Sequence, residues 1–142
     1  MSNYSKGTAI EHKIVHFLEE RGYYATRSAG SKGAFDVIAY NDKVVRFIQA
    51  KYTSNENRSY SADIAKMDAV VVPPNATKEL WIYAANKGFT KCIFLGGVRG
   101  TVQIPEKARL IFHDLEKLRG GNKGSIRGKS SRSRRASTRK KR

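Results

Sequence analysis

Near the start of the chain, apolar residues recur at helical spacing: Ile10, Ile14, Phe17 and Leu18. Positions three and four residues apart lie on one face of a helix, so this pattern predicts a helix over residues 8–21. Thr8 and Glu11 have the spacing of a capping box, whose side chains bond free backbone N–H groups at a helix start. Gly22 follows the pattern and predicts the end of the helix.

Segments rich in β-branched and aromatic residues predict strands. The expected strands are residues 23–27, 35–40, 43–51, 91–95 and 101–104. Asn41 and Asp42, between the second and third of these, predict a hairpin with a two-residue turn.

A second helix is expected over residues 77–87, capped by Asn75 and ended by Gly88. This helix would place Trp81 in the core or at a dimer interface. The polar residues 55–66 predict a loop that leads into a turn of helix. The order of all these elements predicts an α/β fold with a central mixed sheet flanked by helices.

The predicted hairpin brings polar residues of its two strands onto one face of the sheet. With a two-residue turn, Asp36 lies opposite Phe47, and residues opposite each other project to the same face. Alternation along the strand adds Gln49 and Lys51 to that face, at the open end of the hairpin. A turn longer or shorter by one residue would move Asp36 to the other face.

Asp36, Gln49 and Lys51 together offer the parts of a metal-dependent phosphodiesterase site. Carboxylate and amide oxygens are hard ligands that suit Mg²⁺, and the metal lowers the pKa of a coordinated water. A lysine beside them can hold the attacking water or stabilise negative charge on the phosphate. On spacing alone, an equal alternative is a set of solvated polar groups at strand ends.

The charge of the chain indicates a polyanionic partner. Its 142 residues include 28 Lys and Arg against 12 Asp and Glu, a formal net charge of +16. No apolar run approaches the roughly 20 residues of a membrane span, and we expect no membrane partner and no secretory signal. The single cysteine, Cys92, excludes an internal disulfide and a cysteine-cluster metal site.

The basic residues concentrate at the end of the chain. Residues 119–142 hold 11 of the 28 Lys and Arg and no acidic residue. This tail has almost nothing to bury, so we expect it to be disordered and to follow a folded domain at residues 1–118. Arg132, Arg134 and Arg135 are candidate DNA contacts that would bind phosphates without reading sequence. A solubility or targeting tail is the alternative.

Four motifs in residues 6–53 carry a resemblance to a known family: KGTAIE, GYYATRSAGS, FDVIAY and FIQAK. In sequence and order they are similar to the archaeal-type (Hjc-like) Holliday junction resolvases of the PD-(D/E)xK nuclease superfamily. The resemblance implies a restriction-endonuclease-like core, with residues 1–118 as the nuclease domain. It also implies a homodimer that makes two symmetric nicks across a four-way junction.

The resemblance further assigns roles to individual residues. The divalent metal ligands of the family correspond to Glu11, Asp36 and Gln49, which would then also serve catalysis. Lys51 corresponds to the catalytic lysine, and Ser31 to a loop serine implicated in catalysis.

Candidate DNA contacts near these residues come from two arguments. The resemblance implicates Arg27 in junction binding or cleavage. Three further basic residues flank the presumed site and can contact phosphates: Lys32, Arg58 and Lys66.

The sequence departs from the family pattern at three positions. Gln49 replaces the acid of (D/E)xK, which removes one negative ligand and predicts weaker metal binding. Phe35 stands where a proline usually precedes the aspartate, and His12 where an arginine often follows the helix glutamate.

We therefore predict a structure-selective DNA endonuclease that resolves Holliday junctions with Mg²⁺, for which Mn²⁺ can substitute, and with no small-molecule cofactor. The expected partners are branched DNA and a second copy of the chain. The expected location is the cytoplasm, at the nucleoid or, for a virus-encoded protein, inside the host cell. Two alternatives stay open: an Mrr-like or restriction-type nuclease on duplex DNA, and a non-catalytic protein that binds branched DNA.

Overall fold

The computed structural model describes residues 3–28, 33–97 and 102–113. Its elements, in chain order, are α1 (Asn3–Glu19), β1 (Tyr24–Arg27), β2 (Val37–Tyr40), β3 (Val45–Thr53), α2 (Ser61–Asp68), β4 (Ala76–Ala84), β5 (Gly88–Gly97) and β6 (Arg109–Phe112). The strands form one six-stranded sheet in the order β1-β2-β3-β4-β5-β6. The β3–β4 and β5–β6 pairs are parallel and the other pairs antiparallel, so the predicted mixed sheet is confirmed.

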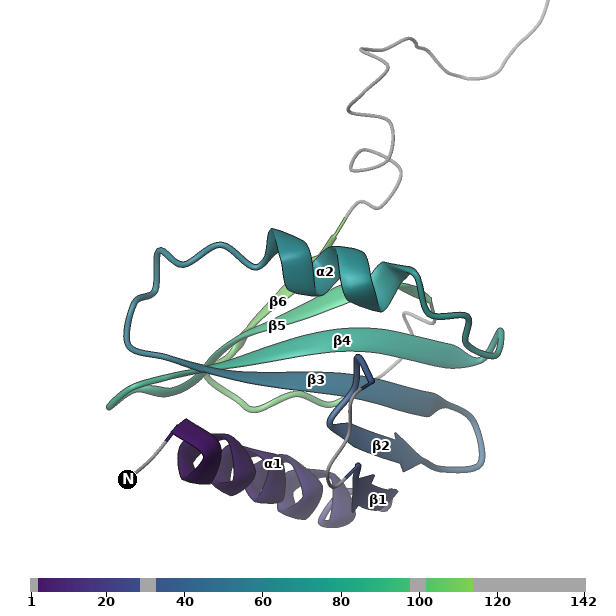
Figure 1. Cartoon of the computed structure of the whole chain (residues 1–142). Coiled ribbons are helices and arrows are strands. Elements are labelled where there is room, and N and C mark those ends of the chain that lie inside the picture. Colours follow the sequence, from purple (N-terminus) through teal and green to yellow (C-terminus); the bar gives the residue numbers. More distant parts are fainter. Residues whose placement is uncertain (1–2, 29–32, 98–101, 114–142) are drawn as a thin grey trace, which may run out of the picture.

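Two hydrophobic clusters cover the two faces of the sheet, with α1 on one side and α2 on the other (Figure 1). The cluster on the α1 side includes Ile14, Leu18, Val37, Ile48, Trp81 and Phe94. The cluster on the α2 side includes Ile64, Met67, Leu80, Ile82 and Leu95. The sheet is thus flanked by helices as predicted, and both α1 and α2 pack on it through apolar side chains.

The second predicted helix is wrong, because its residues form the strand β4. Leu80, Trp81 and Ile82 are all buried, since successive side chains of this central strand enter opposite clusters. A strand buried on both faces has no polar alternation and cannot be distinguished from a buried helix by periodicity alone. Trp81 is thus a core residue of a strand.

The first helix is confirmed but begins earlier than predicted. α1 starts at Asn3, so Thr8 lies inside the helix and forms no capping box with Glu11. The helix ends as expected before Gly22, whose φ of 90° is the left-handed conformation that favours glycine. Neither α1 nor α2, the helices of the described residues, is long and apolar enough to cross a membrane.

Three other predicted segments have mixed outcomes. The strand expected at residues 91–95 is confirmed within β5, and the polar segment 55–66 does lead into a helix, α2. The strand expected at residues 101–104 is wrong where it can be judged, because residues 102–104 are irregular and the next strand is β6.

The β2–β3 hairpin is confirmed, but its turn is longer than predicted. Tyr40 pairs with Val45 instead of Lys43, which leaves residues 41–44 as the connection. The Asn41 side chain accepts a hydrogen bond from the backbone N–H of Lys43 at 2.9 Å. This local bond is typical of asparagine in turns and stabilises the longer connection.

A fully buried ion pair joins β3 to β4. Arg46 and Glu79 are both 0% exposed, and the guanidinium donates to the two carboxylate oxygens at 2.8 and 2.9 Å. The Trp81 indole N–H donates to the same carboxylate at 2.8 Å, and the Thr77 hydroxyl donates to it as well. Several donors therefore compensate the burial of this negative charge.

Replacing Glu79 by glutamine should lower the free energy of unfolding by about 3–5 kcal/mol, because it leaves the Arg46 charge in the core without an opposite charge. The matched control is Glu56→Gln, which removes the exposed ion pair with Lys87 and should change stability little. Urea unfolding of both variants at neutral pH measures the difference. Equal losses would contradict the role of the buried pair.

Candidate functional site

The site lies where β2 ends beside β3. β2 pairs with β3 only as far as the Val37–Ile48 pair, whereas β3 continues to Thr53. Along residues 49–53, β4 lies on one side of β3, and within the described residues no strand pairs on the other. We call this point the fork; it leaves one edge of β3 open beside the end of β2.

Asp36 is held at the fork by two backbone contacts to β3. Its N–H donates to the carbonyl of Ile48 at 2.8 Å, and its Oδ2 accepts from the N–H of Ala50 at 2.9 Å. The register differs from the predicted one by two residues. Because side chains alternate with a period of two, Asp36 still shares a face with Gln49 and Lys51.

Gln49 presents a buried oxygen atom at the fork. The residue is only 9% exposed, and its Oε1 has no hydrogen-bond partner among the described residues. A buried acceptor without a partner costs about 1–3 kcal/mol, so buried polar atoms are almost always satisfied. The exception here is an oxygen that a cation or a water molecule can satisfy.

Burial raises the pKa of the Asp36 carboxyl above its ordinary value, and the Ala50 N–H and the Lys51 charge offset this only in part. Burial also raises the pKa of Glu11, against a hydrogen bond from Arg27, and the Asp36 charge raises it further. Two carboxylates whose negative charge is under-compensated favour a bound cation.

Glu11 reaches the site from α1 and is paired with β1. The Arg27 Nε donates to Glu11 Oε1 at 3.0 Å, and both side chains are largely covered. Glu11 therefore pairs with Arg27 and does not cap the helix as the sequence suggested. The charge of Arg27 is therefore already paired with the Glu11 carboxylate.

Lys51 is oriented by an acidic residue that the sequence analysis missed. Its Nζ lies 3.1 Å from Oδ1 of Asp63, in the first turn of α2, and the two side chains are 26% and 21% exposed. The sequence did not point to Asp63 because residues 55–66 were expected to be a polar loop. A carboxylate in the first turn of a helix is the signal that could have drawn attention to it.

The oxygen set fits a hard divalent cation more loosely than a three-carboxylate site. In the part of the chain that the structure describes, no three His, Cys, Asp or Glu side chains gather as metal ligands. Gln49 explains this, because it contributes a neutral oxygen where a third acid would stand. The available ligands are the carboxylates of Glu11 and Asp36 and the unpartnered Gln49 Oε1.

The remaining candidate residues divide into two groups. Arg58, in the loop after β3, and Lys66, on α2, are exposed, and the Lys66 charge lowers the pKa of Asp36. The others lie outside the described residues: Ser31, Lys32, Arg132, Arg134 and Arg135. The predicted boundary between residues 118 and 119 also lies outside them.

Comparisons with known proteins found a similar solved structure and a matching family model. A similar solved structure is the 1.6 Å structure of Archaeoglobus fulgidus Hjc, a Holliday junction resolvase from an archaeal hyperthermophile. Its sequence is 18% identical, the TM-score is 0.47, and the match covers 63% of this chain and 70% of that one. No curated protein sequence matches the chain.

The family model described as archaeal Holliday junction resolvase (Hjc) matches residues 2–69. This range contains α1, the β2–β3 hairpin and α2, and with them every residue of the fork. Over residues 2–69, just under half of the chain, the sequence is therefore similar to the archaeal Holliday junction resolvase family.

Proposed function

We propose that the chain is a divalent-metal-dependent DNA endonuclease that resolves four-way junctions by paired, symmetric nicks. The observation that carries the proposal is the fork, where Asp36, Gln49 and Lys51 come together inside the range of the resolvase family match. With Glu11, the site offers two carboxylates and an amide oxygen as metal ligands and an ammonium group as a positive charge, and metal-dependent phosphodiester hydrolysis can use all of these.

Glu11, Asp36 and Gln49 are the residues that would hold the metal, Mg²⁺ or in its place Mn²⁺. When bound, a divalent metal polarises the phosphate and lowers the pKa of a coordinated water. The neutral Gln49 oxygen makes the ligand set less negative than three carboxylates, so we expect weak metal affinity.

Lys51 supplies the positive charge that the reaction needs beside the phosphate. The contact with Asp63 restricts its long side chain, so that less conformational freedom is lost when the ammonium group meets the substrate. From this position Lys51 would orient the attacking water or stabilise the negative charge that develops on the phosphate.

Symmetric nicks at a junction need two copies of the site. One fork holds one set of these residues, so we propose that two copies of the chain act as a homodimer on branched DNA. Selectivity for junctions would come from the separation of the two sites, which favours the branch shape over base sequence. Such a protein would work in the cytoplasm, where the DNA is.

One observation favours a second function. Gln49 in place of an acid also suits a protein that binds branched DNA without cutting it, because metal affinity falls when a negative ligand is lost. The experiment below separates the two functions.

Labelled four-way junction and linear duplex are each incubated with the protein and Mg²⁺. Wild type should place paired nicks in the junction only, and Asp36→Asn should reduce the rate at least about a hundredfold by removing a charged ligand. Asp42→Asn, in the exposed turn, removes the same charge away from the fork and should cut like wild type.

Other outcomes of this assay point elsewhere. Junction binding without nicks, with cleavage restored by Gln49→Glu, would select the non-catalytic function. Equal cutting of duplex would indicate a general nuclease and overturn the proposed selectivity.

The raised pKa of Asp36 predicts a stability effect in metal-free protein. The folded state holds this proton more tightly than the unfolded state, so the free energy of unfolding falls as pH rises from 3.8 through the raised pKa. Asp36→Asn should therefore raise the Tm at neutral pH, and the gain should shrink as pH falls towards 3.8.

Divalent metal should raise the Tm of wild type above that of Asp36→Asn, since ligands that bind only the folded state raise the Tm. Thermal unfolding with and without Mg²⁺ or Mn²⁺ should show a shift for wild type and little for Asp36→Asn. A wild-type protein that does not respond to millimolar metal would contradict the assigned ligands.

Asp63→Asn tests the orientation of Lys51. The cleavage rate at saturating junction should fall about tenfold or more because the ammonium group is no longer fixed, whereas junction affinity should not decrease. Asp63→Glu should recover part of the rate. Glu56→Gln, which frees Lys87 from its own ion pair, is the control for the added positive charge and should leave the rate unchanged.

A further inference from the structure

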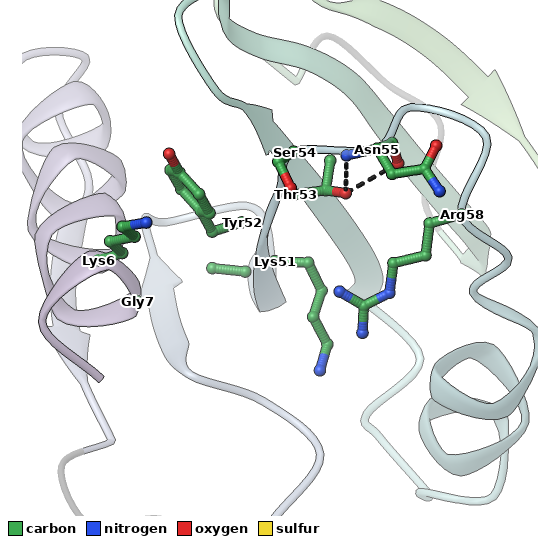
Figure 2. Close-up of a pocket in the computed structure, with 9 residues that line it drawn as sticks. Lys6, Gly7, Lys51, Tyr52, Thr53, Ser54, Asn55 and Arg58 are labelled. Carbon is green, nitrogen blue, oxygen red and sulfur yellow. Dashed lines mark hydrogen bonds between the residues drawn. The ribbon is translucent and has the colours of Figure 1, made fainter. Parts of the chain in front are cut away.

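A pocket of about 510 Å³ lies along the open edge of β3, beyond the fork. It is lined from three sides by Lys6 and Gly7 of α1, by residues 50–53 of β3, and by the loop that carries Asn55 and Arg58. Figure 2 shows the Lys51 and Arg58 side chains extending towards the same region and Lys6 beside the Tyr52 ring.

The positive charge of the pocket is only partly neutralised by ion pairs. Its lining includes Lys6, Lys51 and Arg58 and no acidic residue. Lys51 is paired with Asp63, but among the described residues neither Lys6 nor Arg58 forms an ion pair with a carboxylate. Two cations without counter-charges are therefore available to an anion.

Aromatic rings orient these two cations. The Lys6 Nζ lies 5.0 Å from the centre of the Tyr52 ring, and the Arg58 guanidinium 5.3 Å from that of the Tyr60 ring. A cation–π contact restricts the side chain without cancelling its charge. Lys6 and Arg58 are thus positioned and still able to bind a negative group.

The loop of the pocket is fixed by local hydrogen bonds, drawn in part in Figure 2. The Thr53 hydroxyl donates to the Asn55 carbonyl at 2.8 Å and accepts from the Asn55 N–H at 2.9 Å. The backbone N–H of Arg58 donates to the same carbonyl at 3.1 Å. The turn that presents Arg58 is therefore ordered before any ligand arrives.

We propose that this pocket is a subsite for a DNA backbone phosphate neighbouring the one that is cut, with Lys6 and Arg58 as its ligands. The inference rests on the proposed function. Lys51 lines the pocket and also belongs to the fork, so a strand that meets Lys51 with one phosphate brings an adjacent phosphate into the pocket. The subsite fixes the position of the strand and reads no base.

The first test measures junction binding without divalent metal, so that it does not depend on cleavage. Lys6→Gln and Arg58→Gln should each weaken binding about fivefold to tenfold and lower the salt dependence by about one phosphate contact. Lys43→Gln, in the exposed turn of the hairpin, removes the same charge and should have a smaller effect. Equal effects of Lys43→Gln and Lys6→Gln would overturn the subsite.

Gly7 offers a test that leaves all three cations in place. A Cβ built at Gly7 meets nothing within 4 Å, so a side chain fits there without disturbing the fold. Gly7→Glu adds a carboxylate to the pocket and should weaken binding more than Gly7→Gln, which has the same shape. Equal affinities of these two variants would contradict an anionic ligand.

Neutral phosphate analogues identify the source of the phosphate. A methylphosphonate placed one position from the cut should weaken junction binding by wild type. It should not weaken binding by Lys6→Gln any further, because that variant already lacks the contact. Equal losses in both proteins would overturn the assignment to that position. If micromolar inorganic phosphate stabilised wild type but not Lys6→Gln, the pocket would bind a free anion, and its assignment to a DNA phosphate would be overturned. A wild type that binds in this way but never nicks the junction would refute only the proposed activity.

Discussion

The difference in length between β2 and β3 determines where the candidate site lies on this fold. β2 has 4 residues and β3 has 9, so the second half of β3 has one open edge within the described part of the sheet. Asp36 occupies the point of separation and bonds β3 through its own backbone and side chain. Polar side chains gather there without interrupting the hydrophobic layers on either face.

The buried Arg46–Glu79 pair holds β3 in a fixed register with β4 and so supports everything along the open edge. Parallel strands lack the tight turn that fixes a hairpin, and a charged pair across them specifies one alignment through paired hydrogen bonds. The fork and the pocket beyond it both lie on β3, downstream of Arg46. Their geometry therefore depends on a contact made in the core.

Much of the site could be predicted because its parts are local in sequence. The sequence placed Asp36 on the correct face of the sheet although it predicted too short a turn. The register was wrong by two residues, and a shift of two preserves side-chain alternation. The strand β4 was misread because burial on both faces removes the period that distinguishes strand from helix. Asp63 was missed because residues 55–66 were expected to be a polar loop, and Lys6 because its partner Tyr52 is distant along the chain and only the fold brings the two together.

The single tryptophan and the single cysteine of the chain lie side by side. Trp81 of β4 is paired in register with Cys92 of β5, and both are 0% exposed. The indole also donates a hydrogen bond to Glu79. The protein thus carries an intrinsic optical probe at the centre of its sheet: tryptophan emission reports loss of the core without any label, and a thiol reagent reaches Cys92 only when the packing on the α1 side of the sheet opens.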